Sequence, residues 1–404
     1  MGFGGRARLG LFAGVGVLVT SGLVSPSMAA TPPRAMARPA LRVQVTGRNR
    51  DGTPKLSGAS PTGLSPQVVE AVYGLRPGPT SGAGQTIAIV DAFHDPNALS
   101  DLNKFSSTYG LPTCTTSTCF SRLDPQGTPP VDAGWALEES LDIEWAHAEA
   151  PGARIVLVEA ASASLDDLTS AVAAANRLGA TEVSMSWGGV EFSSETSFDS
   201  TFTRQGTLYT ASSGDSGTGP QYPASSPNII TVGGTTLNGC AGSAAAPGCL
   251  ASETAWSGSG GGVSAFEPPS AAQAGYTGKV SGASSMAALD FGRRATPDVS
   301  FAANPSTGVS VYDSTRFQTQ AGWFTLGGTS VGSPNWAGIL AAGATGGSTN
   351  LQGAPAIYTT ASSSSSSTFL RDITAGSNGA CLTACSAGPG YDLVTGLGSP
   401  INYS

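Results

Sequence analysis

Charged side chains are scarce in this sequence. Asp, Glu, Lys and Arg make up 11% of its 404 residues, against roughly 25% in typical domains. A surface covered by uncharged polar side chains has few ion pairs to lose when carboxylates become protonated. The composition therefore suits an acidic medium, although it also suits any extracellular protein. The net charge of −8 argues against a nucleic acid as the partner.

Histidine is almost absent, because His94 and His147 are the only two in the chain. His94 follows Asp91 by three residues, and His147 falls in an acidic stretch. We interpret both as loop or surface residues and not as general bases. Histidine would also serve poorly in acid, since about 0.3% of a side chain with a pKa near 6.5 stays neutral at pH 4. A nucleophile in this chain needs a different base, and a carboxylate is the candidate.

Long apolar runs are lacking outside the first thirty residues. There, Arg6 and Arg8 precede "LGLFAGVGVLVTSGLV", and small residues end at Ala30. This layout predicts a secretory signal peptide over residues 1–30. A membrane anchor is the alternative, but the run is short and broken by Gly, Ser and Thr. We expect a secreted, extracellular protein that has no membrane attachment after cleavage.

Residues 31–63 are rich in Pro, Gly and Arg and lack periodicity, which predicts a short pro-segment or linker before a single domain over residues 64–404. Basic residues gather in residues 1–63, whereas the remainder is acidic. Such a leader could dock on the acidic body and hold it inactive. A basic signal region followed by a linker would leave the same pattern.

Cysteine is also scarce, and the six cysteines form three close pairs. They are Cys114 and Cys119, Cys240 and Cys249, and Cys381 and Cys385. In a secreted chain this spacing predicts three local disulfides. Fifteen connectivities are possible for six cysteines, so neighbour pairing is a hypothesis. A zinc site is the alternative, but no histidine lies beside a pair and no spacing is Cys-x-x-Cys.

From about residue 64, short apolar runs alternate with amphipathic helical stretches. The runs include "QTIAIVDAF", "ARIVLVEA", "ATEVSMSWG", "GTLYTASSGDSG" and "NIITVGGTTL". This alternation predicts an α/β fold with a mostly parallel central β-sheet flanked by helices. Ligands bind such sheets at the carboxyl ends of the strands.

The first candidate constellation is "GWALEESLDIEWAHAEAPGA", residues 134–153, whose apolar residues follow helical spacing. Glu138 and Asp142 are four residues apart and share one helix face. Two coupled carboxyls can share a proton, which makes one of them a usable base. The alternative is a solvated acidic face that includes the neighbouring glutamates.

Asp215 lies between glycines in "YTASSGDSG", directly after an apolar strand. A protonated Asp at a strand end could donate a hydrogen bond to a developing oxyanion. The alternative is an ordinary turn residue, a common use of Gly-Asp-Ser-Gly.

Ser330 lies in "LGGTSVGSPNWAG", where glycines precede it and a buried helix follows. The glycines permit close approach of a substrate, and the N-terminus of the helix favours an anion. A serine hydroxyl needs a base before it can attack a carbonyl. Ser330 is therefore a candidate nucleophile with a carboxylate as its base.

Six segments of the chain together resemble the sedolisin family, the serine-carboxyl peptidases, from about residue 64 onward. The segments are "LEESLDIEWAHAEAPGA", "SMSWGGVE", "SSGDSG", "YPASSPNIITVGGTTL", "GGGVSAFEPP" and "GGTSVGSPNWAG". The resemblance implies a subtilisin-like fold in which a glutamate replaces the histidine of the triad and an aspartate replaces the oxyanion-hole asparagine.

By this resemblance, Ser330 is the nucleophile, Glu138 the general base and then acid, and Asp142 the residue that orients Glu138. Asp215 would donate to the tetrahedral oxyanion together with the main-chain N–H of Ser330. The substrates would be proteins or peptides, and the protein would act as a monomer. Asp91 and Trp187 occupy places similar to those of residues that extend the proton network in some members.

The C-terminal stretch resembles the calcium site of the family, a C-terminal calcium-binding loop region. The implied ligands are two carboxylates and three main-chain carbonyls. They belong to Asp372, Ile373, Gly388, Gly390 and Asp392. Oxygen ligands of this kind are those that Ca²⁺ prefers, and one structural ion is expected. Without the resemblance, the stretch would be interpreted as a glycine-rich turn with two capping aspartates.

The chain also departs from the family. Gly327 stands where members usually have Ser, and the Cys381–Cys385 insertion lies inside the calcium loop. Members commonly carry a large folded pro-domain, whereas only about thirty residues separate the predicted signal cleavage from the predicted domain here. Two other functions therefore stay open. One is a glycosidase that uses Glu138 and Asp142 as its carboxylate pair, and the other is a secreted binding protein on a catalytically silent peptidase scaffold.

Overall fold

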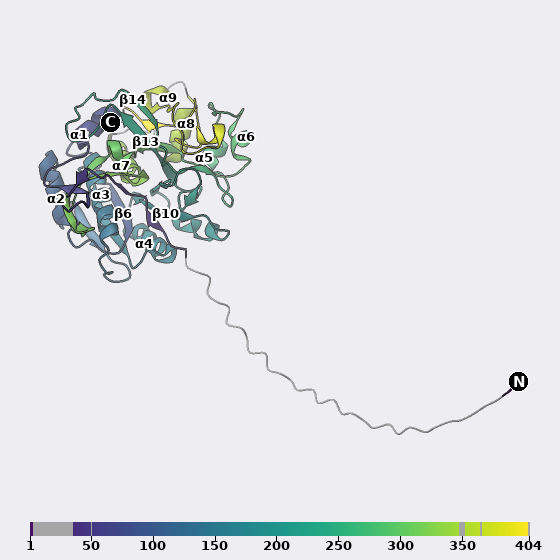
Figure 1. The fold of residues 1–404 in the computed structure, drawn as a ribbon, viewed down its shortest axis with the longest axis horizontal. Helices are drawn as coiled ribbons and strands as arrows, with labels where there is room; N and C mark the ends of the chain where they lie inside the picture. The colour runs from purple at the N-terminus through teal and green to yellow at the C-terminus, as the bar shows by residue number, and fades with distance from the viewer. Residues whose placement is uncertain (3–34, 50, 347–351, 364–365, 403–404) are drawn as a thin grey trace. The chain divides into compact units, whose positions relative to one another are not determined.

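The structure, a computed structural model, describes residues 1–2, 35–49, 51–346, 352–363 and 366–402. Residues Arg34–Ser404 form one compact unit (Figure 1). The predicted signal peptide lies almost wholly outside the described residues. None of the helices in the described ranges is long and apolar enough to cross a membrane.

A mostly parallel β-sheet of eight strands forms the centre of the unit, as the sequence predicts. Within the sheet, only the pairing of the last strand at one edge is antiparallel. The strands, from that edge, are β14 (Ser252–Ala255), β13 (Ile230–Asn238), β11 (Leu208–Ser212), β9 (Glu182–Met185), β6 (Thr86–Ala92), β8 (Arg154–Ala160) and β7 (Phe120–Leu123), and β17 (Val299–Ala302) pairs with β13.

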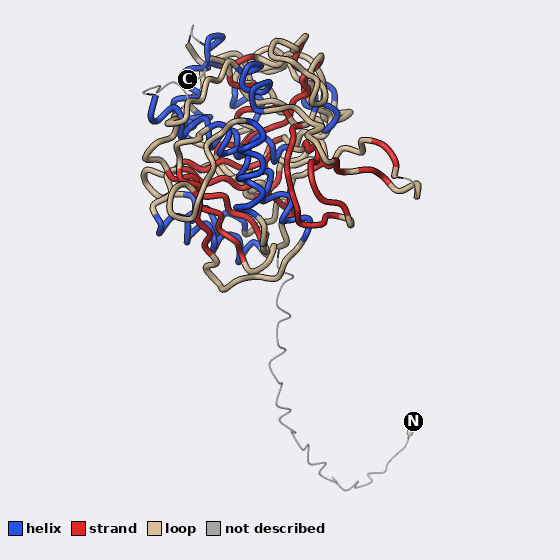
Figure 2. Tube along the Cα trace, turned by 90° about the vertical axis from the view of Figure 1, so that its left-hand side faces the viewer, coloured by secondary structure: helices blue, strands red, loops and turns tan. Residues whose placement is uncertain are grey.

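Helices cover both faces of this sheet (Figure 2). Alternate residues of β6 show how the two faces are filled, since successive side chains of a strand point to opposite sides. Ile87 and Ile89 pack in one apolar cluster with Ile143, whereas Val90 packs in another with Leu168. The helices on the first face are α2 (Ala98–Tyr109), α3 (Ala133–Glu149) and α7 (Gly332–Gly346), and α4 (Leu165–Leu178) lies on the second.

Helix α3 is buried on all sides, because every residue from Trp135 to Glu149 is buried. A solvated acidic face, the alternative interpretation of this stretch, is therefore wrong. The interpretation of His147 as a loop or surface residue is also wrong, since its side chain is enclosed and its Nε2 lies 2.8 Å from the carbonyl of Pro112. Asp132 begins the helix by accepting hydrogen bonds from the N–H groups of its first turn.

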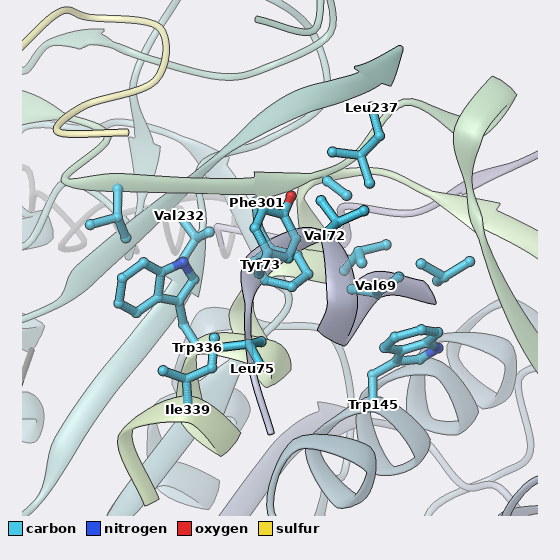
Figure 3. Close-up of a cluster of buried hydrophobic side chains, with 14 of the residues drawn as sticks. Val69, Val72, Tyr73, Leu75, Trp145, Val232, Leu237, Phe301, Trp336 and Ile339 are labelled. Carbon is cyan, nitrogen blue, oxygen red and sulfur yellow. The ribbon is translucent and has the colours of Figure 1, made fainter. Parts of the chain in front are cut away.

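The largest apolar cluster of the described residues includes side chains of α1 (Pro66–Tyr73) and α7 (Figure 3). Tyr73 stacks on Phe301 with 4.4 Å between ring centroids. Trp145 and Trp336 are fully enclosed, and each indole N–H donates to a main-chain carbonyl. The polar atoms of these large side chains are thus satisfied within the core, and α3 and α7 are fixed against the strands.

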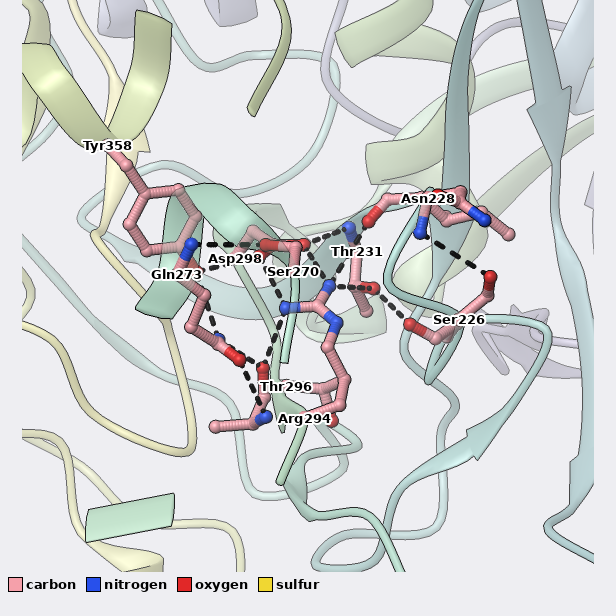
Figure 4. Close-up of polar contacts among 12 residues, drawn as sticks. Ser226, Asn228, Thr231, Ser270, Gln273, Arg294, Thr296, Asp298 and Tyr358 are labelled. Atoms are coloured by element: carbon pink, nitrogen blue, oxygen red, sulfur yellow. Dashed lines mark hydrogen bonds and ion pairs between the residues drawn. The ribbon is translucent and has the colours of Figure 1, made fainter. Parts of the chain in front are cut away.

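A buried ion pair fixes the loops beside β13 and β17 (Figure 4). Arg294 is fully enclosed, and its Nη1 donates to Oδ1 of Asp298 at 2.7 Å. Asp298 also accepts from the N–H of Thr231 at 2.7 Å and from the hydroxyl of Tyr358 at 2.7 Å. Because both charges are paired and hydrogen-bonded, their burial is tolerated.

Residues 35–43 and 56–63 pack along the domain. β1 (Arg38–Pro39) pairs with β10 (Trp187–Val190), which pairs with β12 (Gln221–Tyr222). β2 (Arg42–Val43) and β5 (Ser57–Gly58) both pair with β19 (Gln320–Gly327), the partner of β18 (Val309–Phe317). The segment predicted as a pro-segment or linker is thus paired with strands of the domain.

The remaining elements are short. They are β3 (Gly47–Arg48), β4 (Pro54–Lys55), η1 (Glu195–Phe202), β15 (Gly262–Val263), α5 (Ala271–Ala274), α6 (Met286–Asp290), β16 (Ala295–Thr296), η2 (Pro305–Thr307), η3 (Thr329–Val331), α8 (Gly353–Ala361), α9 (Ser366–Phe369), β20 (Leu370–Arg371), η4 (Leu382–Cys385) and β21 (Ser399–Pro400). The three disulfides join the predicted neighbours: Cys114–Cys119, Cys240–Cys249 and Cys381–Cys385.

Candidate active site

Ser330 lies where β19 turns into α7, in the short helix η3. Gly328 makes the turn with a φ of 100°, a conformation that favours glycine. A side chain there would also collide with the carbonyl of Ala40 and with Oδ2 of Asp215. Glycine is therefore required at position 328 both by the turn and by the crowding around it.

Three carboxyl groups lie together without a cation. Glu138 and Asp142 come from α3, Asp91 comes from the end of β6, and all three are 0% exposed. Their oxygens have no hydrogen bond of standard geometry, and none of the three forms an ion pair within the described residues. Burial raises the pKa of Asp91 to about 8. Such groups can hold and pass protons in acid.

Glu138 faces the candidate nucleophile. Burial raises its pKa well above the usual value and Asp91 raises it further, whereas the nearby Ser330 hydroxyl lowers it. Oγ of Ser330 also lies 3.3 Å from the carbonyl of Ser186 and donates to it. The approach to Glu138 is close but does not have standard hydrogen-bond geometry, a common state before substrate binds.

Asp142 lies behind Glu138 in this group. Burial raises its pKa well above the usual value, Asp91 and Glu138 raise it further, and the nearby Ser186 hydroxyl lowers it. The four-residue spacing on α3 thus brings the two carboxyls together on the side of the helix that faces Ser330.

Asp215, after the end of β11, lies beside the turn that carries Ser330. Its Oδ1 accepts from the N–H of Thr329 at 2.8 Å and from the Thr329 hydroxyl at 3.0 Å. Oδ2 is buried and has no hydrogen bond, although Nε of Arg42 lies 3.5 Å from it. Burial raises the pKa of Asp215 to about 7. In acid its Oδ2 therefore carries a proton that it can donate.

The structure separates the two residues suggested as an extension of the network. Asp91 contacts the group electrostatically, because its charge raises the pKa of both Glu138 and Asp142. The indole N–H of Trp187 instead donates to the carbonyl of Val90 at 2.7 Å. Trp187 therefore positions the end of β6 and makes no hydrogen bond to the carboxyls.

Sequence reasoning missed Thr329 and Ser186. Thr329 precedes the serine and holds Asp215, so its place in "GGTS" was the available signal. Ser186 contributes a main-chain carbonyl, which no sequence pattern reveals. A cleft of about 610 Å³ adjoins the site and is lined by residues 35–42 and by parts of residues 188–192 and 214–222.

The candidate calcium ligands lie around one loop. Oδ2 of Asp392 accepts from the N–H of Gly388 at 3.0 Å, and Oδ2 of Asp372 accepts from the N–H of Gly390 at 2.9 Å. Asp392 is 2% exposed and makes no ion pair within the described ranges. No cluster of three or more His, Cys, Asp or Glu side chains that could hold a metal is found there.

The architecture is that of a subtilisin-like α/β protein with a serine at the entrance of a buried helix. Residues 133–376 match the subtilase family. The chain is 30% identical over 415 residues to kumamolisin of Bacillus sp. (strain MN-32), covering 91% of this chain and 67% of that protein. It is 28% identical over 399 residues to sedolisin of Pseudomonas sp. (strain 101), covering 90% of this chain.

A solved structure agrees with these relatives. Pseudomonas sedolisin, a serine-carboxyl proteinase complexed with two molecules of pseudo-iodotyrostatin, superposes with a TM-score of 0.68 at 26% identity and covers 85% of this chain and 96% of its own. The chain belongs to the sedolisin family of the subtilases. It spans 63% of the length of the curated sedolisin.

Proposed function

We propose that this protein is a secreted, acid-acting serine-carboxyl endopeptidase that cuts proteins and peptides. Family membership supports the reaction class. The observation that carries the proposal is the grouping of Glu138, Asp142 and Asp215 around Ser330, with no histidine among them. His94 instead pairs with Glu159 at 2.8 Å, away from this group.

In the proposed reaction, Oγ of Ser330 attacks the scissile carbonyl carbon while Glu138 takes the hydroxyl proton. Asp142, whose own pKa is raised by the neighbouring Glu138, holds that carboxyl in place. Glu138 then gives the proton to the leaving amine nitrogen, and the acyl-enzyme remains on Ser330. Water hydrolyses the acyl-enzyme by the same proton transfers in reverse order.

The oxyanion of the tetrahedral intermediate has two proposed donors, the main-chain N–H of Ser330 and the protonated Oδ2 of Asp215. Two features support this role of Asp215. Its Oδ1 is held by Thr329, and its Oδ2 is buried without a hydrogen-bond partner. A preorganised donor of this kind contributes about 2.7–4 kcal/mol to transition-state stabilisation.

Secretion is proposed on the leader over residues 1–30 and on the three disulfides, which persist in oxidising compartments. The protein would then act as a monomer without attachment to a membrane. Nucleic acid is not a proposed partner, because the net charge is −8.

One structural Ca²⁺ is proposed at the loop that follows β20. The carboxylates of Asp372 and Asp392 would bind it, together with the main-chain carbonyls of Ile373, Gly388 and Gly390. These residues fit the ion, because hard oxygen donors are those that Ca²⁺ takes and because Asp392 is a buried carboxylate without a cationic partner among the described residues. The ion would stabilise the loop.

The test is hydrolysis of denatured casein from pH 2 to 7 by the wild type, Ser330→Ala and Glu138→Gln. We expect both variants to lose essentially all turnover. Glu139→Gln is the matched control, since Glu139 is the buried neighbour on α3 whose pKa responds to Glu159 and Asp91 and not to Ser330. Wild-type turnover in Ser330→Ala would overturn the proposal. Inactivity of a folded wild type at every pH would favour a silent binding protein. Polysaccharide hydrolysis that survives the loss of Ser330 would favour a glycosidase.

A further inference from the structure

The N-terminal segment crosses the candidate active site as an extended strand. Arg38 pairs with Gly188 and Pro39 with Trp187 in antiparallel register, and the N–H of Ala40 continues this register by donating to the carbonyl of Ser186 at 3.0 Å. β10 thereby gains one strand from the segment. This is the way in which an extended peptide is recognised through main-chain hydrogen bonds.

The hydrogen bonds continue on both sides of Ala40. Toward the N-terminus, the N–H of Ala37 donates to the carbonyl of Ala163 at 2.9 Å. Toward the C-terminus, Arg42 and Val43 pair with β19, and the N–H of Gln44 donates to Thr325 at 2.9 Å. The backbone is thus fixed from one end of the site to the other, and Ala40 lies at the centre.

The carbonyl of Ala40 occupies the proposed oxyanion site. It accepts a hydrogen bond of 3.0 Å from the main-chain N–H of Ser330. It also lies on the same face of Gly328 as Oδ2 of Asp215, because a Cβ built on that glycine would collide with both oxygens. The main-chain N–H of Ser330 and Oδ2 of Asp215 thus both lie beside the carbonyl oxygen of Ala40.

We propose that the peptide bond between Ala40 and Leu41 is a substrate of this same site, and that the chain cuts itself there. The inference rests on the proposed peptidase function and adds a specific bond and a substrate geometry to it. Until the cut, residues 35–43 block the cleft against other substrates.

The chemistry follows the proposed reaction. Oγ of Ser330 bonds to the carbonyl carbon of Ala40 and its proton passes to Glu138. The bond from that carbon to the nitrogen of Leu41 then breaks, and Glu138 returns the proton to this nitrogen. One water molecule hydrolyses the ester on Ser330, which leaves a carboxyl group on Ala40 and a new amino terminus at Leu41.

Side chains of the segment indicate how substrates are selected. Ala37 and Ala40 are buried, whereas Arg38 is exposed and Pro39 half-buried. The two buried positions hold only methyl groups, and the adjoining cleft retains about 610 Å³. At positions 37 and 40 the segment is therefore held mainly by its backbone, and a substrate with larger side chains there has space to gain contacts.

The test follows the amino terminus of the chain by mass spectrometry at early times, at the acidic pH where casein is digested. We expect the first new terminus at Leu41, formed at a rate independent of protein concentration, because the bond already lies in its own active site. Ser330→Ala should stay intact. A peptide with the sequence of residues 35–43, AMARPALRV, should be cut by the processed enzyme between Ala and Leu, and its reversed sequence should not.

A variant tests the main-chain register. Ala40→Pro removes the N–H that bonds Ser186, and we expect it to slow self-cleavage at least about tenfold, a rough figure for losing a backbone hydrogen bond and its register. Val45→Ala is the control, since Val45 is 57% exposed and lies beyond the cleft. A first cut elsewhere, or a cut whose rate depends on protein concentration, overturns the inference. If the protein still digests casein in that case, the peptidase proposal stands. Failure to cut casein as well as the chain would instead reject the peptidase.

Discussion

Oδ1 of Asp215 accepts two hydrogen bonds from Thr329, one from its main-chain N–H at 2.8 Å and one from its hydroxyl at 3.0 Å. The orientation of the Asp215 carboxyl group is thereby fixed. Oδ2, which has Nε of Arg42 3.5 Å away but no hydrogen bond, is left as the proposed donor. Asp215→Ala should lower kcat by about 10² to 10³, the effect of removing one oxyanion-hole donor. Thr329→Val keeps the main-chain bond and should lower kcat only a few-fold, about the loss of one ordinary hydrogen bond. Equal losses in the two variants would contradict this role of Asp215.

The pH dependence of activity should report the proton on Asp215. Burial raises the pKa of Asp215 to about 7, with Arg42 lowering it in part. The donor is therefore present below about pH 7 and lost above it. We expect kcat/KM of the wild type to fall as the pH rises through this range. The residual activity of Asp215→Asn should lack this fall, since an amide donates at every pH.

Stability should be greatest in acid. Burial raises the pKa of Glu182 and of Asp313 to about 8. Because these folded-state pKa values exceed the unfolded ones, the folded chain binds more protons. The contribution of these two groups to stability is fully present below about pH 4 and is lost as the pH rises through about 8. Each pKa unit corresponds to about 1.4 kcal/mol at most. Urea unfolding of Ser330→Ala from pH 3 to 9 should show the decline, and Glu182→Gln should make it shallower.

Calcium should stabilise the fold if Asp392 binds it. A ligand present at 100 times its Kd adds about 2.7 kcal/mol to the free energy of unfolding. We expect EGTA to lower the Tm of the wild type and to leave the Tm of Asp392→Asn unchanged. Asp51→Asn is the control, because Asp51 is exposed and accepts only within its own turn. Restoration of the Tm by Mg²⁺ as readily as by Ca²⁺ would contradict a calcium site.

Breaking the buried ion pair should be costly. Arg294→Met leaves Asp298 buried without its cation and should lower the free energy of unfolding by about 3–5 kcal/mol. The double variant Arg294→Met/Asp298→Leu should recover part of that loss, since no charge then remains unpaired. Urea unfolding in the Ser330→Ala background measures both without self-digestion. This account would be rejected if the double variant lost more free energy of unfolding than the two single variants lose together.

The fold was accessible from the sequence because it depends on local patterns. The alternation of apolar runs and helical stretches predicted the parallel sheet, and the four-residue spacing of Glu138 and Asp142 placed both on one side of α3. The close spacing of the cysteines predicted the pairs that the structure contains. In contrast, the four-residue spacing of Glu138 and Asp142 also fitted a solvated acidic face. Helical periodicity gives the relative direction of side chains but not which neighbours cover them.

The sequence by itself indicated the alternation of strands and helices, the neighbour pairing of the cysteines, and the serine and carboxyl residues of the candidate site. Only the tertiary structure decided that α3 is buried on all sides, that Trp187 donates to Val90, and that Ala40 lies against Ser330. The physical reason is that these properties depend on contacts between segments far apart in the chain. A short extended stretch such as residues 35–43 has no periodicity of its own, and its place is set by the main-chain donors and acceptors of the strands that it meets.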